Sequence, residues 1–192
     1  FNDLVTYDGL IIEELNNSRV TPPNRLFAEL LMLDSGSRLM ELRFFGKGNT
    51  AGDAVLWLPA ERILITGDTV VAPTPFGSGS YPRSWAAMLG RFRGLQPRYL
   101  VPGHGPVQEG PAYLELLTET LEMIADQADV AVAAGLSQER FEAQFDWQGY
   151  PQRFHHNNPR LRLRFEQWFA GPVLEAAYRE AGGQDIEPQG SD

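Results

Sequence analysis

The chain has 192 residues, of which 43% are hydrophobic and 21% are charged, a composition typical of one globular domain rather than of a disordered or fibrous segment. Its formal net charge of -9, with arginines scattered along the chain, argues against a nucleic-acid partner, because neutralising phosphates requires a concentrated basic surface. Cysteine is absent, which excludes disulfides and thiolate ligands and leaves His, Asp and Glu to build any metal site.

The first part of the chain predicts a helix followed by a β-hairpin. Residues 1–19 place Leu10, Ile11 and Leu15 at the spacing of one helical face. Further on, the apolar stretches LFAELLMLD and RLMELRFF flank a Ser-Gly-Ser sequence at 35–37, which indicates a hairpin turn. We therefore expect a pair of strands after the first helix.

Two more strands, an irregular loop and a fifth strand are predicted next. The runs DAVLWLP and RILITGD are nearly continuously apolar, which indicates strands covered on both faces. Residues 72–82 are so rich in Pro, Gly and Ser that we expect no regular element there. The stretch RYLVPGHG then predicts a strand that runs into a loop.

Helices are predicted on both sides of this fifth strand. A short helix begins near Ser84 and ends at Gly94, and a long helix follows Pro111 and ends at Gly135. Ser137 is a good N-cap for another short helix. The apolar faces of the first two helices consist of Trp85, Met88, Leu89 and Phe92, and of Leu114, Leu117, Leu121, Ile124 and Ala128.

The order of these elements predicts a single domain, 1–192, with an α/β or α+β architecture in which helices pack against a sheet. Residues 26–108 form its sheet-rich part, 111–181 its helical part and 182–192 a loose polar tail. The last helix, at about 160–181, is expected to be interrupted at Gly171-Pro172.

The glycine-rich octet GKGNTAGD at 46–53 is a poor match for a phosphate-binding loop. Gly46 and Gly48 begin a G-x-G-x-x-G pattern, but Ala51 stands where the third glycine belongs, and a strand follows instead of a helix. The Gly-Lys-Ser/Thr ending of a P-loop is also missing. GSGSY at 77–81 likewise fails the G-x-S-x-G pattern of a serine nucleophile.

Three short stretches share one arrangement, in which an apolar strand leads to a polar residue beside glycine. They are Gly48-Asn49-Thr50, Gly67-Asp68-Thr69 and Gly103-His104-Gly105. Metal-binding and catalytic side chains often lie at such strand ends, because the sheet fixes them while the loop exposes them. Asn49 and Asp68 taken alone are also ordinary turn residues, whereas flanking glycines leave the His104 ring little to pack against.

Taken together, GNTAGDAVLWLPAERILITGDTVV and SYPRSWAAMLGRFRGLQPRYLVPGHGPV resemble the C-terminal half of a metallo-β-lactamase-fold hydrolase. That family has G-x-x-H-T-x-G-D, a strand pair ending in Gly-Asp, a helix with Trp near its start, and P-G-H-G after a strand. The match covers about residues 26–108, with the motifs in order. The resemblance implies a metallo-β-lactamase-like αββα sandwich, of which this chain holds the C-terminal part and a C-terminal helical extension.

The resemblance also implies a metal-dependent hydrolase, in which metal-bound water attacks a carbonyl or phosphoryl centre of a small-molecule substrate. Asp68 resembles the carboxylate that bridges two metals, and His104 resembles the histidine of the second site, so the implied cofactor is zinc, as one or two divalent ions. Asn49 occupies the place of a first-site histidine, beside the metal or the substrate. Phe76 and Tyr81, in the loop 72–82, would line the substrate pocket, although that loop is equally compatible with a plain surface loop.

Two departures from the family leave a second hypothesis open. The H-x-H-x-D-H signature that supplies most ligands in the family is not found in this chain, and the other histidines, His155 and His156, are interpreted as an exposed surface pair. An amide oxygen at Asn49 is also a weaker zinc ligand than imidazole. The alternative is a non-catalytic relative that has lost its metal site and acts as a binding or scaffold protein.

Half of a sandwich would leave the inner face of its sheet bare. Leu56, Leu58, Ile63 and Ile65 are the residues expected to be exposed there. We therefore expect that a further N-terminal segment or a homo-oligomer covers this face. The sequence has no apolar run of the ~18–20 residues that a membrane span needs, so we expect a soluble protein. The lack of cysteine and of a basic-then-apolar leader in these residues favours the cytoplasm.

Overall fold

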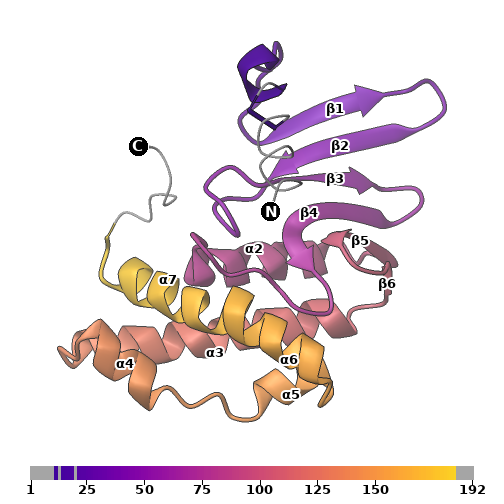
Figure 1. Ribbon diagram of the computed structural model, residues 1–192. Coiled ribbons are helices and arrows are strands. Elements are labelled where there is room, and N and C mark those ends of the chain that lie inside the picture. Colours follow the sequence, from indigo (N-terminus) through magenta and orange to yellow (C-terminus); the bar gives the residue numbers. More distant parts are fainter. Residues whose placement is uncertain (1–10, 13, 20, 185–192) are drawn as a thin grey trace, which may run out of the picture.

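The computed structural model describes residues 11–12, 14–19 and 21–184. Helical residues at 11–12 and 14–17 agree with the expected N-terminal helix, whereas Leu10 and the end of the expected loose tail lie outside the described residues. Figure 1 shows a sheet in the upper half of the molecule and helices packed below it.

The strands form one six-stranded sheet in which every strand lies beside its sequence neighbours. They are β1 (Leu30–Asp34), β2 (Leu39–Phe44), β3 (Ala54–Leu58), β4 (Ile63–Val71), β5 (Tyr99–His104) and β6 (Gln108–Glu109). From β1 to β4 the pairing is antiparallel, which confirms the predicted hairpin and the strand pair after it. β4 and β5 are parallel, and since parallel strands need a crossover, α2 (Pro82–Gly94) connects them.

The later helices follow the predicted order, with one addition. They are α3 (Ala112–Ala133), α4 (Gln138–Gln144), α5 (Tyr150–His155), α6 (Pro159–Phe165), the π-helical segment η1 (Glu166–Ala170) and α7 (Gly171–Ala181). Ser137 caps α4 as expected, by accepting a hydrogen bond from the Arg140 N–H, whereas α5 was not predicted. None of the helices in the described part of the chain is long and apolar enough to cross a lipid bilayer.

The expected interruption of the last helix at Gly171-Pro172 is wrong in its position. The irregular turn is η1, which lies just before these residues, and α7 begins at Gly171. Pro172 fits there because the first turn of a helix does not need its missing N–H group.

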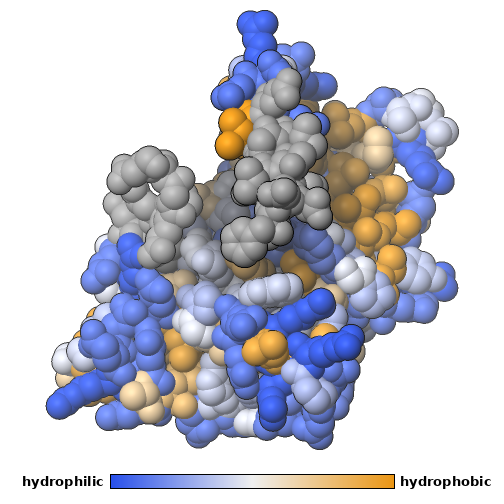
Figure 2. Space-filling model, in the orientation of Figure 1, coloured by the Kyte–Doolittle hydropathy of each residue, from blue (hydrophilic) through white to orange (hydrophobic). Residues whose placement is uncertain are grey.

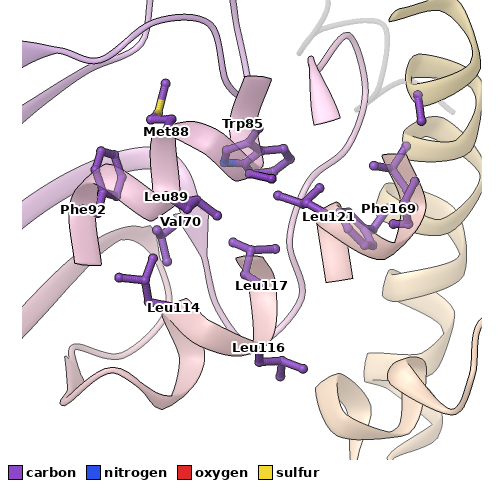
Figure 3. Packing of buried hydrophobic residues seen from close by; sticks show 14 of the residues in the cluster. Val70, Trp85, Met88, Leu89, Phe92, Leu114, Leu116, Leu117, Leu121 and Phe169 are labelled. Carbon is purple, nitrogen blue, oxygen red and sulfur yellow. The ribbon is translucent and has the colours of Figure 1, made fainter. Parts of the chain in front are cut away.

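The main core lies between the sheet and the helices α2 and α3. The four residues predicted to share a face of α2, namely Trp85, Met88, Leu89 and Phe92, are all buried. In Figure 3 Leu89 lies beside Val70 of β4, with Leu114 and Leu117 of α3 below them, and Phe169 of η1 lies near Leu121. Burial of this apolar surface holds α2 and α3 on one face of the sheet.

The opposite face of the sheet is only partly covered, so the prediction that the apolar strands are covered on both faces is wrong. Leu31, Leu42, Leu56, Ile65 and Val101 are register partners across five strands and form one row. All five are half-buried or exposed. Figure 2 shows hydrophobic residues, in orange, gathered over the strands at the right of the molecule.

The exposures predicted for this face hold in part. Ile65 keeps 37% of its surface exposed, as expected. Leu56 and Ile63 are half-buried, and Leu58 is buried, which contradicts the prediction for that residue. A second sheet, as in a complete αββα sandwich, does not occur among residues 21–184, so the described part corresponds to one sheet layer and its helical cover.

The N-terminus of α2 is capped by a residue from the other end of the chain. Tyr81, at the N-cap position, makes no side-chain cap. Instead the carboxylate of Glu180 in α7 accepts hydrogen bonds from the Arg83 N–H at 2.7 Å and from the Ser84 N–H and hydroxyl at 3.1 and 2.6 Å. This contact joins the helical part to the crossover of the sheet.

Candidate metal centre

Asp68 lies on a bulge near the carboxyl end of β4. The pairing of β4 with β5 shifts register on both sides of Gly67, which has a left-handed φ of 54°. Thr69 and Trp85 support this irregular backbone, because the Thr69 hydroxyl donates to the Thr66 carbonyl at 2.8 Å and the Trp85 indole donates to the Thr69 carbonyl at 3.0 Å. Bulges of this kind redirect a side chain out of the regular alternation of a strand.

His104 is the last residue of β5, between two glycines that allow close backbone approach. A Cβ on Gly103 would lie 2.0 Å from the Asp68 carboxylate, and a Cβ on Gly105 would lie 2.0 Å from the Ala72 carbonyl oxygen. Gly105 also has a φ of 95°, which other residues rarely adopt. The P-G-H-G sequence is therefore required here to let the ends of β4 and β5 approach each other.

These two strand ends bring Asp68 and His104 together. The His104 Nε2 atom lies 3.5 Å from Asp68 Oδ1, and the two side chains remain 74% and 53% exposed. A carboxylate and an imidazole are suitable ligands for zinc, and their exposure leaves room for further ligands. In the described part of the chain, however, no group of three or more His, Asp or Glu side chains is arranged to bind a metal.

Asn49 does not join this pair. Its side chain is 5% exposed, and its amide nitrogen donates a hydrogen bond to the Phe76 carbonyl at 2.6 Å. The turn around it is held by Asp53, which accepts hydrogen bonds from the Thr50 N–H at 2.8 Å and from the Thr50 hydroxyl at 2.6 Å. The octet GKGNTAGD is thus a turn whose asparagine anchors the loop after β4.

Asp68 and His104 open into a cleft of about 650 Å³. Phe76 lines this cleft, at the position expected of it. Tyr81 is not among the lining residues; the Lys47 ammonium lies over the Tyr81 ring, 4.6 Å from the ring centre. The buried Thr74 also lines the cleft, and its hydroxyl has no hydrogen-bond partner in the described part of the protein. The cleft therefore combines two candidate metal ligands with an apolar wall and an unsatisfied polar group.

Sequence reasoning did not indicate that Arg164 of α6 and Trp168 of η1 line this cleft. The guanidinium of Arg164 lies 5.3 Å from the centre of the Trp168 ring. Their i, i+4 spacing would have placed them on one helical face, but nothing local indicates that this face meets the ends of β4 and β5.

The interpretation of His155 and His156 as an exposed pair is wrong for His155. The His155 ring is 4% exposed, and its Nδ1 atom accepts a hydrogen bond from the Asn157 N–H at 3.0 Å. His156 is exposed and ends α5 in a left-handed conformation. Neither residue lines the cleft.

A tyrosine from α3 fixes the end of β4 near the site. The Tyr113 hydroxyl donates to the Val71 carbonyl at 2.5 Å, and desolvation by burial raises the pKa of this phenol well above its ordinary value. Tyr113 is therefore a neutral hydrogen-bond donor that holds the strand preceding the cleft.

Comparisons with known proteins agree with this arrangement. A family model described as the metallo-beta-lactamase superfamily matches residues 7–104, just over half of the 192-residue chain. The matched range contains Asp68 and ends at His104. No curated protein matches the chain.

Solved structures resemble different portions of the chain. A metallo-beta-lactamase from Pontibacter korlensis is 28% identical with a TM-score of 0.48, over 58% of this chain and 54% of its own length. The stereoselective inverting sec-alkylsulfatase Pisa1 from Pseudomonas sp. is 15% identical with a TM-score of 0.64, over 83% of this chain and 27% of its own length. The second likeness shows a shared fold, and the chain spans only about half and about a quarter of these two proteins.

Proposed function

Because the chain belongs to the metallo-β-lactamase superfamily, we propose that it is the C-terminal part of a metal-dependent hydrolase in which Asp68 and His104 contribute to the metal centre. The observation that carries this proposal is the convergence of the two side chains at 3.5 Å, at the carboxyl ends of the parallel strands β4 and β5. Ligands commonly bind at that edge of parallel strands.

A contribution to folding stability does not explain why Asp68 and His104 are exposed together at glycine-rich strand ends. An exposed ion pair contributes roughly 0–1 kcal/mol, and glycines within strands weaken a sheet. Nevertheless Gly67, Gly103 and Gly105 all occur where the two strands present Asp68 and His104. A binding role accounts for a backbone that is shaped to expose two good metal ligands.

When bound, a divalent metal such as zinc supplies Lewis acidity that activates water and polarises a carbonyl or phosphoryl oxygen. The Asp68 carboxylate and the His104 imidazole would hold the metal at the strand ends. Phe76 and Trp168 would limit the access of bulk water to the cleft and contact the substrate, a small molecule of unknown identity. A catalytic zinc ion has three protein ligands, so one or two zinc ions would need ligands in addition to Asp68 and His104. These would come from residues outside the part of the chain that the structure describes.

The proposal is tested by the zinc content of the purified 192-residue chain and of any longer form, after equilibrium dialysis against zinc. Asp68→Ala and His104→Ala should each lower the zinc content and weaken zinc binding at least about tenfold, because a two-ligand anchor loses half of its donors. Asp126→Ala and His156→Ala are matched controls, since these side chains are exposed and lie outside the cleft. Wild-type zinc content no higher than that of both cleft variants would refute the proposal.

Asn49 favours a second candidate function, a non-catalytic relative that uses the cleft for binding without a metal. Its amide nitrogen is engaged with the Phe76 carbonyl, and it occupies the position at which the family pattern has a histidine. The zinc measurements separate the two functions. A retained metal centre should bind zinc in the wild type and lose it in Asp68→Ala and His104→Ala, whereas a site that has lost its metal should show no zinc binding in any of the three forms.

A further inference from the structure

We propose that the helical part of the chain provides the substrate-recognition wall of the cleft, with Arg164 binding an anionic group of the ligand while Trp168 and Phe76 pack against its apolar part. This inference deepens the proposed hydrolase function and rests on it, because the bound ligand is a substrate only if the protein is a hydrolase. It assigns the ligand to the class of small organic anions with an apolar or aromatic body.

Arg164 is available to a ligand, whereas two other arginines of the helical part contact carboxylates. Arg162 on the same helix contacts Glu166 at 3.8 Å, and Arg153 on α5 contacts Glu119 at 3.2 Å. Among the residues that the structure describes, no carboxylate forms an ion pair with Arg164, although this side chain lines the cleft. A guanidinium without an acidic partner can bind the oxygens of a carboxylate, sulfate or phosphate group through two parallel hydrogen bonds.

Trp168 restricts the orientation of this guanidinium. The two groups stack at 5.3 Å, a contact that arginine makes without losing its hydrogen-bond donors. Because the stacked side chain has less rotational freedom to lose, an anion meets a partly preorganised donor.

The backbone around Trp168 is shaped to fix the cleft wall. Trp168 lies in η1, and π-helical turns occur frequently at functional sites. Its carbonyl accepts a hydrogen bond at 2.8 Å from the Gly77 N–H, in the loop that carries Thr74 and Phe76. A Cβ on Gly77 would lie 2.9 Å from the Val173 Cβ, so this glycine lets the loop lie directly against the helices. The two walls of the cleft are therefore held at a fixed separation.

The remaining surface of the cleft suits an apolar ligand body with at least one polar atom. Phe76 and Trp168 are large side chains that stay 43% and 45% exposed, and covering them would remove apolar area from water. The Thr74 side chain also lines the cleft, and its buried hydroxyl has no hydrogen-bond partner in the described part of the protein. Apolar walls with a few polar groups are typical of small-molecule sites.

The test uses the full 192-residue chain and two probes of the same shape, 4-phenylbutyrate and its neutral amide, 4-phenylbutyramide. Binding is measured by isothermal titration calorimetry, first with EDTA and then with zinc. In EDTA the wild type should bind the anion about tenfold more tightly than the amide, since a hydrogen bond to a charged group has about that effect. Arg164→Gln should abolish this preference, whereas the matched control Arg162→Gln should retain it.

Further variants separate the role of each group. Trp168→Leu should weaken binding of both probes several-fold, because the apolar contact and the stacked orientation of Arg164 are both lost. Arg164→Lys should keep part of the preference for the anion. Circular dichroism and thermal unfolding of each variant confirm that the exposed substitutions leave the fold intact.

The outcomes distinguish this inference from the metal proposal. Preference for the anion in EDTA that depends on Arg164 supports the recognition wall even if zinc content is unaffected by Asp68→Ala and His104→Ala. Equal affinity for the two probes, no saturable binding of either, or a preference retained in Arg164→Gln overturns the inference, whatever the zinc content.

Discussion

At the scale of single residues, two glycines determine how closely the strand ends that carry Asp68 and His104 approach each other. Gly103 and Gly105 stand where any side chain would overlap the Asp68 carboxylate or the Ala72 carbonyl. The turn at 46–53 is held by side-chain hydrogen bonds instead, because Asp53 accepts from the Thr50 N–H and Asn49 donates to the Phe76 carbonyl in the loop after β4. Gly103 and Gly105 thus set the backbone approach that brings Asp68 and His104 together.

Gly103→Ala tests this dependence. The new Cβ would meet the Asp68 carboxylate at 2.0 Å and the backbone carbon of Gly67 at 2.7 Å, so β4 and β5 must separate. We expect a loss of about 1–3 kcal/mol in the free energy of unfolding, measured with urea, together with weaker zinc binding. The control Gly90→Ala, on an open face of α2, should raise stability by up to about 1 kcal/mol. Unchanged stability in Gly103→Ala would contradict the close packing of these strands.

At the scale of elements, α2 is the piece that joins the sheet to the helical part. Its buried face packs between the sheet and α3, its Trp85 supports the bulge that carries Asp68, and its N-terminus is capped by Glu180 of α7. A carboxylate at this end of a helix also interacts favourably with the helix dipole. Through this cap on α2, the C-terminal helix α7 supports the backbone that carries Asp68, although the two are distant in the sequence.

Glu180→Ala should show how much this cap contributes. The change leaves the backbone N–H groups of Arg83 and Ser84 and the Ser84 hydroxyl without an acceptor. We expect a loss of about 1–3 kcal/mol in urea unfolding, because the groups are partly shielded from water. Glu175→Ala, which removes only an exposed i, i+4 pair with Arg179, should cost about 0.3–0.5 kcal/mol. Equal losses in the two variants would show that the cap has no special role.

At the scale of the whole molecule, the partly covered sheet face is expected to set the behaviour of the chain in solution. The row of Leu31, Leu42, Leu56, Ile65 and Val101 crosses five strands, and its side chains are half-buried or exposed among the residues that the structure describes. Contiguous apolar surfaces of this kind are usually covered by another protein surface. For the 192-residue chain by itself, the available cover is a second copy.

We therefore expect this chain to associate reversibly, with an average mass that rises with concentration in light scattering. Ile65→Lys, in the middle of the row, should shift the molecules towards monomers, because a charged group cannot be buried in an apolar contact without a partner. Val130→Lys, an equally large change at an exposed position of α3, should leave the mass unchanged. A monomer at every concentration would contradict this expectation.

The sequence by itself determined the local features. Hydrophobic periodicity predicted the strands and the buried faces of α2 and α3, and the glycine-flanked motifs singled out Asp68 and His104, because periodicity and turn chemistry depend only on neighbouring residues. Only the tertiary structure decided that these two side chains meet at 3.5 Å, that Arg164 and Trp168 line their cleft, and that His155 is buried. Each of these depends on packing between elements that are distant in the chain, and no local pattern encodes which helix face will meet which strand end.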